Sequence, residues 1–399
     1  MLEILFAFLI GIISGVLAGL IPGIHPNLIS SIIVIYTASL TTIFSPLSLA
    51  IFIITLAITN TFVNFIPSIY LGAPDDDNFL STLPGHQMLK KGKAHEAAVL
   101  TLYGSLIALV IILIFIPIFI YVLPTVFQKT KIILPFILIF ISLYIIFRES
   151  KILLGITIFL LSGFLGFAAL NLPVKEPLLP LLTGLFGTSS LIVSLKDKVK
   201  IPKQKISKLK EIKVEKKDIL KAASASIISA PLCSFLPGIG AGHAAVIGSE
   251  TIEQSQKGFL ILLGIINTAV EGLSFITLFA ISRARSGASV AIKEILKSLT
   301  IQNLIIVAAT IIIAGVLASI ITLYLSKLSA KYISKIKYNK HSIITIAIIS
   351  IATLLISNPL GFLVLITATS LGIFAILSNS RRINLMGCLL IPTILFYLF

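Results

Sequence analysis

Residues 19–27 read GLIPGIHPN, and residues 235–243 read FLPGIGAGH. Each stretch interrupts an apolar run that would otherwise continue as a helix. Proline removes a backbone donor and clashes with the preceding turn, and glycine loosens the backbone, so both stretches predict a break in a membrane helix. Two such breaks at corresponding places in two halves of a chain are typical of the binding site of a secondary transporter.

The composition is that of a membrane protein. Of 399 residues, 57% are hydrophobic and 12% are charged, and the mean hydropathy is +1.11, whereas a soluble domain has about 25% charged residues. Long apolar runs occupy residues 106–123, 132–147, 304–323 and 343–356. We therefore predict an all-α polytopic membrane protein with roughly ten to twelve membrane segments, some of them too short to span the bilayer alone.

The basic residues are clustered. The net charge is +16, and the densest cluster of lysines runs from Lys196 to Lys221. Such a run can bind nucleic acid, but cytoplasmic loops of membrane proteins also carry an excess of Lys and Arg, and we predict a cytoplasmic linker in a multi-pass protein of the cell membrane. The two cysteines, Cys233 and Cys388, lie in apolar surroundings and indicate neither a disulfide framework nor a metal site.

The second half of the chain repeats the first at a constant offset. Pro22–Ile24 matches Pro237–Ile239 (237 − 22 = 215), and Gly72–Ala73 matches Gly287–Ala288 (287 − 72 = 215). Each match is weak by itself. Their shared offset across about seventy residues predicts a duplicated architecture.

This repeat suggests how the chain is organised. We predict a first transmembrane repeat at residues 1–195, the basic cytoplasmic linker at residues 196–217, and a second transmembrane repeat at residues 218–399. The second repeat follows the basic linker and should start in the cytoplasm, whereas the first follows an acidic N-terminus and should start outside. The repeats would then be inverted, each with a broken helix or a re-entrant hairpin.

The two breaks supply the candidate substrate site. A broken helix leaves backbone N–H groups without intrahelical partners and presents the positive end of the helix dipole, so two such ends near mid-membrane would hold an anion, above all a carboxylate. The alternative is that the Pro-Gly pairs only bend helices or form surface turns. The candidate residues in the breaks are Pro22, Gly23, His25, Asn27, Pro237, Gly238, Gly240, Gly242 and His243.

The two histidines in the breaks have two interpretations. His25 and His243 could donate to an anion or carry a proton. Alternatively, each is a neutral histidine bonded to a backbone carbonyl. The glycines around His243 would let a ligand approach the main chain closely.

Four polar residues lie inside apolar helices. Asn60 and Asn64 are four residues apart and share one helical face. Polar groups inside a membrane usually face a cavity, although bonding between helices is the alternative. We assign Asn60 and Asn64 to substrate binding, and Asn267 and Glu271 to coupling with Na⁺ or H⁺. No other cofactor is expected.

Other polar groups give weaker signals. The acidic run Asp75–Asn78 could bind a cation, but consecutive positions point in different directions, so a solvated loop is expected. Arg283 and Arg285 could pair with an anionic substrate or with Glu271, or could be interface charges. The sequence lacks the zinc-protease, serine-hydrolase and phosphate-loop signatures, so nothing in it supports an enzyme.

Several stretches carry a family resemblance. They are the Gly-x-x-Pro-Gly break at residues 19–23, PSIYLGAP at residues 67–74, LPGHQMLKKGKAHEAA at residues 83–98, LPGIGAG at residues 236–242 and CLLIPT at residues 388–393. Together they resemble the large membrane (permease) subunit of the tripartite tricarboxylate transporter family, in a divergent, shorter form. Where that family has a Glu-x-x-Asn-Asn element after the second break, this chain has INTAVE at residues 266–271.

The resemblance implies a multi-pass permease that moves a carboxylate such as citrate, driven by an ion gradient. It also implies two partners, a small membrane subunit and an extracytoplasmic solute-binding protein, and a homo-oligomer is a further option. The sequence itself leaves alternatives open, because helix ends hold phosphate as readily as carboxylate. One is a transporter or flippase of a lipid-linked phosphate such as polyprenyl phosphate, and another is an intramembrane enzyme that acts on lipid head groups.

Overall fold

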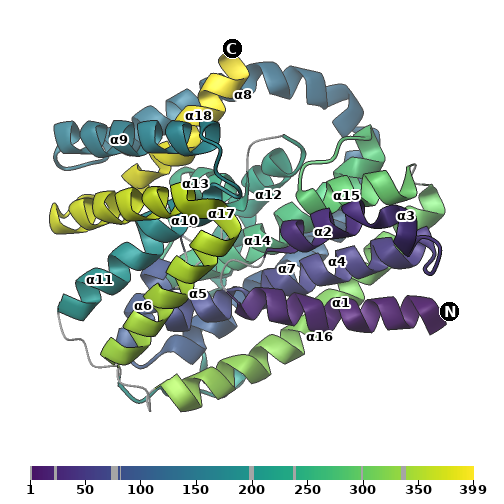
Figure 1. Cartoon of the computed structure of the whole chain (residues 1–399), viewed down its shortest axis with the longest axis horizontal. Helices are drawn as coiled ribbons and strands as arrows, with labels where there is room; N and C mark the ends of the chain where they lie inside the picture. The colour runs from purple at the N-terminus through teal and green to yellow at the C-terminus, as the bar shows by residue number, and fades with distance from the viewer. Residues whose placement is uncertain are drawn as a thin grey trace. The chain divides into compact units, whose positions relative to one another are not determined.

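A computed structural model describes residues 2–21, 25–72, 80, 82–196, 202–236, 240–297, 300–333 and 338–399. Across these ranges the secondary structure is helical and contains no β-strand (Figure 1). The prediction of an all-α protein is therefore confirmed.

In the first half, long apolar helices alternate with short ones. They are α1 (Leu2–Leu20), α2 (Pro26–Ile35), α3 (Thr37–Leu40), α4 (Pro46–Val63), α5 (Phe65–Leu71), α6 (Thr82–Lys90), α7 (Ala94–Tyr121), α8 (Leu123–Phe147), α9 (Ile152–Asn171), α10 (Leu178–Leu182), the π-helix η2 (Thr183–Thr188) and α11 (Ser189–Lys196).

The second half also contains both long and short helices. They are η3 (Leu209–Glu211), α12 (Lys216–Phe235), α13 (Ala241–Thr251), α14 (Gln256–Ile281), α15 (Gly287–Leu296), α16 (Ile301–Ile333), α17 (Tyr338–Leu377), η4 (Arg382–Met386) and α18 (Gly387–Leu398).

Contacts divide the chain into two compact units. Unit 1 comprises Met1–Ile66, His95–Phe127 and Ser207–Leu328, and unit 2 comprises Pro67–Ala94, Gln128–Ile206 and Ser329–Phe399. Each unit therefore contains segments of both predicted repeats. The repeats and their boundaries stay a prediction.

The chain leaves the helix at both predicted breaks. α1 ends at Leu20 and α2 begins at Pro26, whereas α12 ends at Phe235 and α13 begins at Ala241. The following helices have only 10 and 11 residues. At about 1.5 Å per residue each reaches only about half way across a hydrocarbon core of roughly 30 Å.

Glycines bring α1 and α4 together in unit 1. A Cβ atom on Gly11 would lie 2.8 Å from the Cβ of Thr55, and one on Gly15 would lie 2.6 Å from the Cβ of Thr59. Gly19 continues the same face beside Val63. Small residues four apart let the backbones of two membrane helices approach, and Figure 1 shows α1 and α4 side by side.

α4 and α14 are the innermost apolar helices of unit 1. In the candidate spans that contain them, 94% and 89% of the most apolar window is buried inside the protein. α14 contacts α4, α12, α13 and α15. It also meets α7 backbone to backbone, because a Cβ on Gly104 or Gly264 would overlap a carbonyl oxygen of the facing helix.

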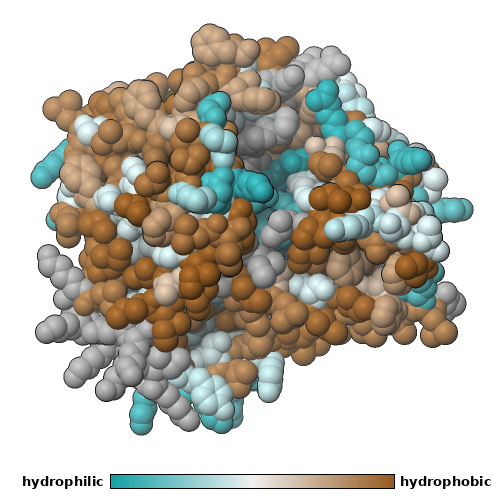
Figure 2. Space-filling model, in the orientation of Figure 1, coloured by the Kyte–Doolittle hydropathy of each residue, from teal (hydrophilic) through white to brown (hydrophobic). Residues whose placement is uncertain are grey.

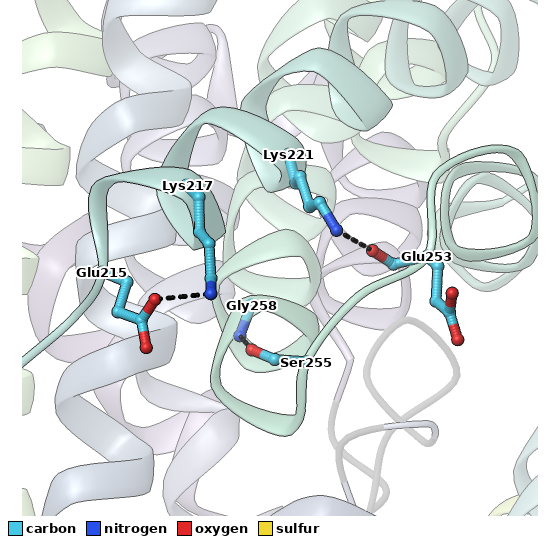
Figure 3. A network of polar contacts seen from close by, with 6 residues as sticks. All are labelled: Glu215, Lys217, Lys221, Glu253, Ser255 and Gly258. Atoms are coloured by element: carbon cyan, nitrogen blue, oxygen red, sulfur yellow. Dashed lines mark hydrogen bonds and ion pairs between the residues drawn. The ribbon is translucent and has the colours of Figure 1, made fainter.

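Polar contacts tie the start of α14 to its neighbours (Figure 3). The Ser255 hydroxyl accepts from the Gly258 N–H (3.0 Å) and caps α14. Lys221 on α12 donates to the carbonyl of Glu253 (3.4 Å), and Lys257 pairs with Glu96 at the start of α7 (2.7 Å). These contacts gather charged side chains near the starts of α7, α12 and α14.

Unit 2 contains a helix break that the sequence prediction missed. α17 is interrupted at Asn358, whose φ of 66° and ψ of 177° are non-helical. The Asn358 side-chain oxygen accepts from the N–H groups of Leu360 and Gly361, and its amide donates to the Pro173 carbonyl (2.7 Å). The arm after the break therefore begins with a capped helix end, and Figure 1 shows the two arms of α17 running in different directions.

A buried polar cluster holds the last helices of unit 2. The Glu149 carboxylate accepts from the Ser380 hydroxyl (2.9 Å), the Arg381 N–H (2.9 Å) and the Asn384 amide (2.6 Å). Burial alone would raise the pKa of Glu149, but these hydrogen bonds and one from the Ser150 N–H outweigh it and hold the pKa below its ordinary value. Nearby in the sequence, the Arg382 guanidinium donates to the carbonyls of Leu185 and Phe186 in the π-helix.

The surface fits a lipid environment. Within the described ranges, seven helices are long and apolar enough to cross a membrane, and three shorter apolar helices accompany them. Large apolar side chains are exposed on several helices, among them Leu2, Tyr121, Leu153 and Leu355 at 80–85%. Figure 2 shows apolar residues over most of the face in view. In water such patches would be unfavourable, so these faces contact lipid.

Candidate functional site

A chain of amides connects the two central helices of unit 1. The Asn267 Nδ2 on α14 donates to the Asn64 Oδ1 (3.1 Å), and the Asn64 Nδ2 donates to the Asn60 Oδ1 on α4 (3.3 Å). All three side chains are buried, with at most 2% of their surface exposed. The structure therefore brings Asn60 and Asn64 together with Asn267, although 203 residues separate Asn64 from Asn267.

The way α4 ends explains why the Asn267 side chain is held beside it. α4 ends at Val63, so the carbonyl of Thr61 belongs to the last turn, where carbonyls need partners from outside the helix. Asn267 Nδ2 donates to this carbonyl (3.0 Å). The Thr61 hydroxyl contacts the Thr268 hydroxyl (3.1 Å) beside it. Thr268 takes no part in the amide chain. Sequence reasoning missed Thr61, whose only signal is its position next to Asn60.

The amide chain lies near mid-height of both helices. Asn267 is the twelfth residue of the 26 in α14 (267 − 256 + 1 = 12), and Asn60 is the fifteenth of the 26-residue span that begins at Pro46 (60 − 46 + 1 = 15). An unpaired buried polar atom costs about 1–3 kcal/mol. Polar side chains at this depth consequently mark a functional position in most membrane proteins.

Each break carries a histidine at the start of the helix that follows. His25 is the N-cap of α2, and its Nδ1 accepts from the Asn27 N–H (3.2 Å). His243 lies in the first turn of α13, and its Nδ1 accepts from the N–H of the N-cap Gly240 (3.2 Å). An Nδ1 that accepts a hydrogen bond carries no proton, so both rings are neutral and present an N–H at Nε2. His243 is 3% exposed, and His25 is half-buried.

Asn27 lies in the first turn of α2, but its side chain contacts a different helix. Its side-chain oxygen accepts from the Ala288 N–H at the start of α15 (3.2 Å). Gly287 allows this approach, because a Cβ there would lie 2.8 Å from the Cβ of Asn27. Asn27 thus joins the helix after the first break to a helix of the second half.

Glu271 reaches the start of the same helix. It lies one turn after Asn267 on α14, and its carboxylate accepts from the hydroxyl of Ser286 (3.1 Å), the N-cap of α15. A helix N-terminus favours a carboxylate because of its dipole. Ser286, which sequence reasoning missed, has a recognisable signal: it precedes the apolar run of α15 and is a preferred N-cap type.

The other predicted residues are placed as follows. Gly240 and Gly242 lie at the start of α13, and Gly242 is buried. Pro22, Gly23, Pro237, Gly238 and the acidic run Asp75–Asn78 lie outside the described residues. The Arg283 guanidinium lies over the Phe127 ring, 5.0 Å from its centroid. Both cysteines are free thiols and buried, and the described part of the chain has no His, Cys, Asp and Glu cluster that could hold a metal ion.

The arrangement is suited to binding an anion. Two neutral histidines, the starts of α2, α13 and α15 and a buried amide chain provide hydrogen-bond donors and positive dipole ends. α2 packs on α4, α13 packs on α14, and α4 contacts α14, so both breaks adjoin the helices that carry the amides. Glu271, the one carboxylate among the predicted site residues, accepts a hydrogen bond from the Ser286 hydroxyl.

Comparison with known proteins identifies the family of the chain. The model of the family described as "Tripartite tricarboxylate transporter TctA family" matches residues 5–387. A protein of Methanocaldococcus jannaschii described as uncharacterized is 32% identical over 358 residues, which cover 87% of this chain and 88% of that protein. No solved structure matches the chain. The family model covers nearly all of this multi-pass membrane protein, and the chain belongs to the tripartite tricarboxylate transporter TctA family.

Proposed function

We propose that this chain is the permease subunit of a secondary active transporter that moves a di- or tricarboxylate, driven by an ion gradient. The single observation that carries the proposal is the buried amide chain of Asn60, Asn64 and Asn267 at mid-height of α4 and α14. A protein with a purely structural role would gain little from placing three amides in its least accessible helices.

The helix breaks support an anionic substrate. α2 and α13 each begin next to a break, and their first N–H groups and dipoles favour negative charge. His25 and His243 both present an Nε2–H donor in a neutral ring. Several neutral donors can release a carboxylate more easily than one fixed cation can, as transport requires.

Asn267 and Glu271 support coupling to a cation. Both lie on α14, one helical turn apart, and Glu271 is one of the few carboxylates within a candidate span. In transporters with broken helices, oxygen atoms at the break coordinate Na⁺ or carry H⁺. Family membership adds two proposed partners, a small membrane subunit and an extracytoplasmic solute-binding protein.

A thermal-shift screen of the purified chain tests the proposal. The ligands are citrate and other di- and tricarboxylates, inorganic phosphate, and polyprenyl phosphate, each with sodium or with choline. A ligand that binds only the folded state raises the melting temperature. We expect a carboxylate to stabilise the protein. Stabilisation by polyprenyl phosphate alone would contradict the proposal and favour a carrier of lipid-linked phosphate.

Two buried histidines of unit 1 provide matched variants. His243→Phe removes the N–H donor at the second break and should abolish the carboxylate shift. His95→Phe is the matched control, because His95 is also buried but is bonded to Ser326 on α16 (2.8 Å), outside the candidate site. It should keep the shift, and loss of the shift in both variants would point to general destabilisation rather than binding.

A further inference from the structure

The amide chain has a direction, and one backbone carbonyl sets it. The Thr61 carbonyl can only accept, so the atom of Asn267 that faces it must be the Nδ2 donor. The same Nδ2 contacts Asn64, which must present its oxygen there. The remaining Nδ2 of Asn64 then faces the oxygen of Asn60. Turning any one amide around would place two donors or two acceptors against each other.

Because the hydrogen bonds of the amide chain all run in one direction, its two ends are chemically different. Asn60 ends the chain with its Nδ2, and Asn267 ends it with its Oδ1. Among the residues that the structure describes, neither atom has a hydrogen-bond partner, and both residues are 2% exposed. Buried polar atoms are almost always paired, so a donor and an acceptor left over in one network call for ligands.

We propose that the two ends bind opposite charges: the Asn60 amide N–H groups donate to a carboxylate oxygen of the substrate, and the Asn267 carbonyl oxygen ligates the coupling cation. Asn64 links the two sites. This assignment rests on the proposed function and extends it, because it places substrate and cation at opposite ends of one hydrogen-bonded chain.

The chemistry of the acceptor end selects the kind of cation. An amide oxygen has no proton to exchange and does not titrate, so it cannot carry H⁺. Carbonyl oxygens are instead ordinary ligands of hard metal cations, and transporters use them for sodium. The Asn267 end is therefore a sodium site rather than a proton site.

The chain also couples the two ligands. A cation at the Asn267 oxygen withdraws electrons from that amide and makes its Nδ2 a stronger donor to Asn64. Asn64 is polarised in turn, and Asn60 becomes a stronger donor to the carboxylate. Coupling is reciprocal, so sodium should tighten substrate binding as much as substrate tightens sodium binding.

The test measures citrate affinity calorimetrically on the full chain in detergent, in sodium and in choline. In wild type, sodium should tighten citrate binding by about tenfold or more, within the usual range of allosteric coupling. Thr268→Val is the control, because it alters the same helix pair and a buried hydroxyl without touching an amide. It should keep the sodium effect.

Aspartate has nearly the same shape as asparagine, so two Asn→Asp variants test the two ends of the amide chain separately. Asn60→Asp still accepts from Asn64 but replaces the donor end with an acceptor, so citrate binding should fall by at least about tenfold while the thermal shift caused by sodium alone persists. Asn267→Asp keeps an oxygen for sodium but loses the N–H that begins the chain. Its sodium shift should persist, and sodium should change its citrate affinity by less than about twofold.

The possible failures are distinct. If wild type binds no carboxylate, the proposed function is wrong and this assignment falls with it. If wild type binds citrate but Asn60→Asp binds it equally well, or Asn267→Asp keeps the full sodium effect, only the assignment of the two ends is overturned.

Discussion

Single residues show how the polar groups are held in an apolar interior. Asn267 satisfies a carbonyl in the last turn of α4 with the same amide nitrogen that contacts Asn64. Glu149 in unit 2 is a contrasting case, because its carboxylate accepts several hydrogen bonds within its own cluster. Among the described residues, the amide chain leaves Asn60 Nδ2 and Asn267 Oδ1 without a hydrogen-bond partner. The Glu149 carboxylate instead fixes the chain around Ser380 and Asn384.

Replacing Glu149 should change the pH dependence of stability. Its pKa is lower in the folded state, so its stabilising contribution is present above the ordinary carboxyl pKa and is lost as pH falls through the depressed value. Glu149→Gln should lower the free energy of unfolding by about 1–3 kcal/mol at neutral pH. The variant should also lose less stability than wild type as the pH is lowered.

The measurement is the melting temperature from about pH 7 down to about pH 2.5, a range that extends well below the ordinary glutamate pKa of about 4.3. Glu211→Gln, at an exposed position of η3, is the control and should follow wild type at every pH. A Glu149→Gln profile parallel to that of wild type would show that the carboxylate does not titrate as the hydrogen bonds imply.

At the scale of helices, close backbone packing decides which elements meet. The glycines of α1 lie on one face against α4, and Gly104 and Gly264 join α7 to α14. These contacts hold α4 and α14 at the centre of unit 1. The candidate site therefore rests on helix interfaces that tolerate little added volume.

Adding one methyl group should loosen this packing. A Cβ on Gly15 would lie 2.6 Å from the Cβ of Thr59 and 2.7 Å from the Leu56 carbonyl oxygen. Gly15→Ala should therefore destabilise the protein by about 1–3 kcal/mol, measured by thermal unfolding in detergent. Leu17→Phe enlarges a side chain that is 54% exposed on the same helix and should have little effect. Equal stability of Gly15→Ala and wild type would refute this packing.

The sequence could predict the helices and the two breaks, because they depend on local chemistry. Apolar length, Pro-Gly pairs and small-residue spacing act within a few residues along the chain. The break at Asn358 was missed because an isolated asparagine before Pro359 lies in an otherwise apolar run. The π-helix η2 was missed for a different reason: its carbonyls accept from Arg382, which lies 196 or more residues away in the sequence.

The details of the candidate site depend on distant partners. Asn27 is a preferred N-cap type, yet His25 takes the N-cap position of α2. The Asn27 side chain instead accepts from the Ala288 N–H in the first turn of α15. No residue near Asn27 in the sequence indicates that its side chain accepts from Ala288. The polar positions Asn60, Asn64 and Asn267 could be identified from sequence, but not their order of hydrogen bonding, which follows from where α4 ends.

At the scale of the whole molecule, the two halves of the sequence meet inside one compact unit. α2 and α4 from the first half contact α15 from the second, and α4 also contacts α14. Residues from both halves therefore contribute to the candidate site.

The central claim is that the chain carries a carboxylate through the site at Asn60. Counterflow in proteoliposomes tests it most directly, since exchange under equal sodium on both sides needs no gradient. Vesicles that contain the purified chain and unlabelled citrate should take up radiolabelled citrate faster than protein-free vesicles. Vesicles with Thr268→Val should do the same, and vesicles with Asn60→Asp should not. Exchange equal to that of protein-free vesicles, or unchanged in Asn60→Asp, would contradict the account.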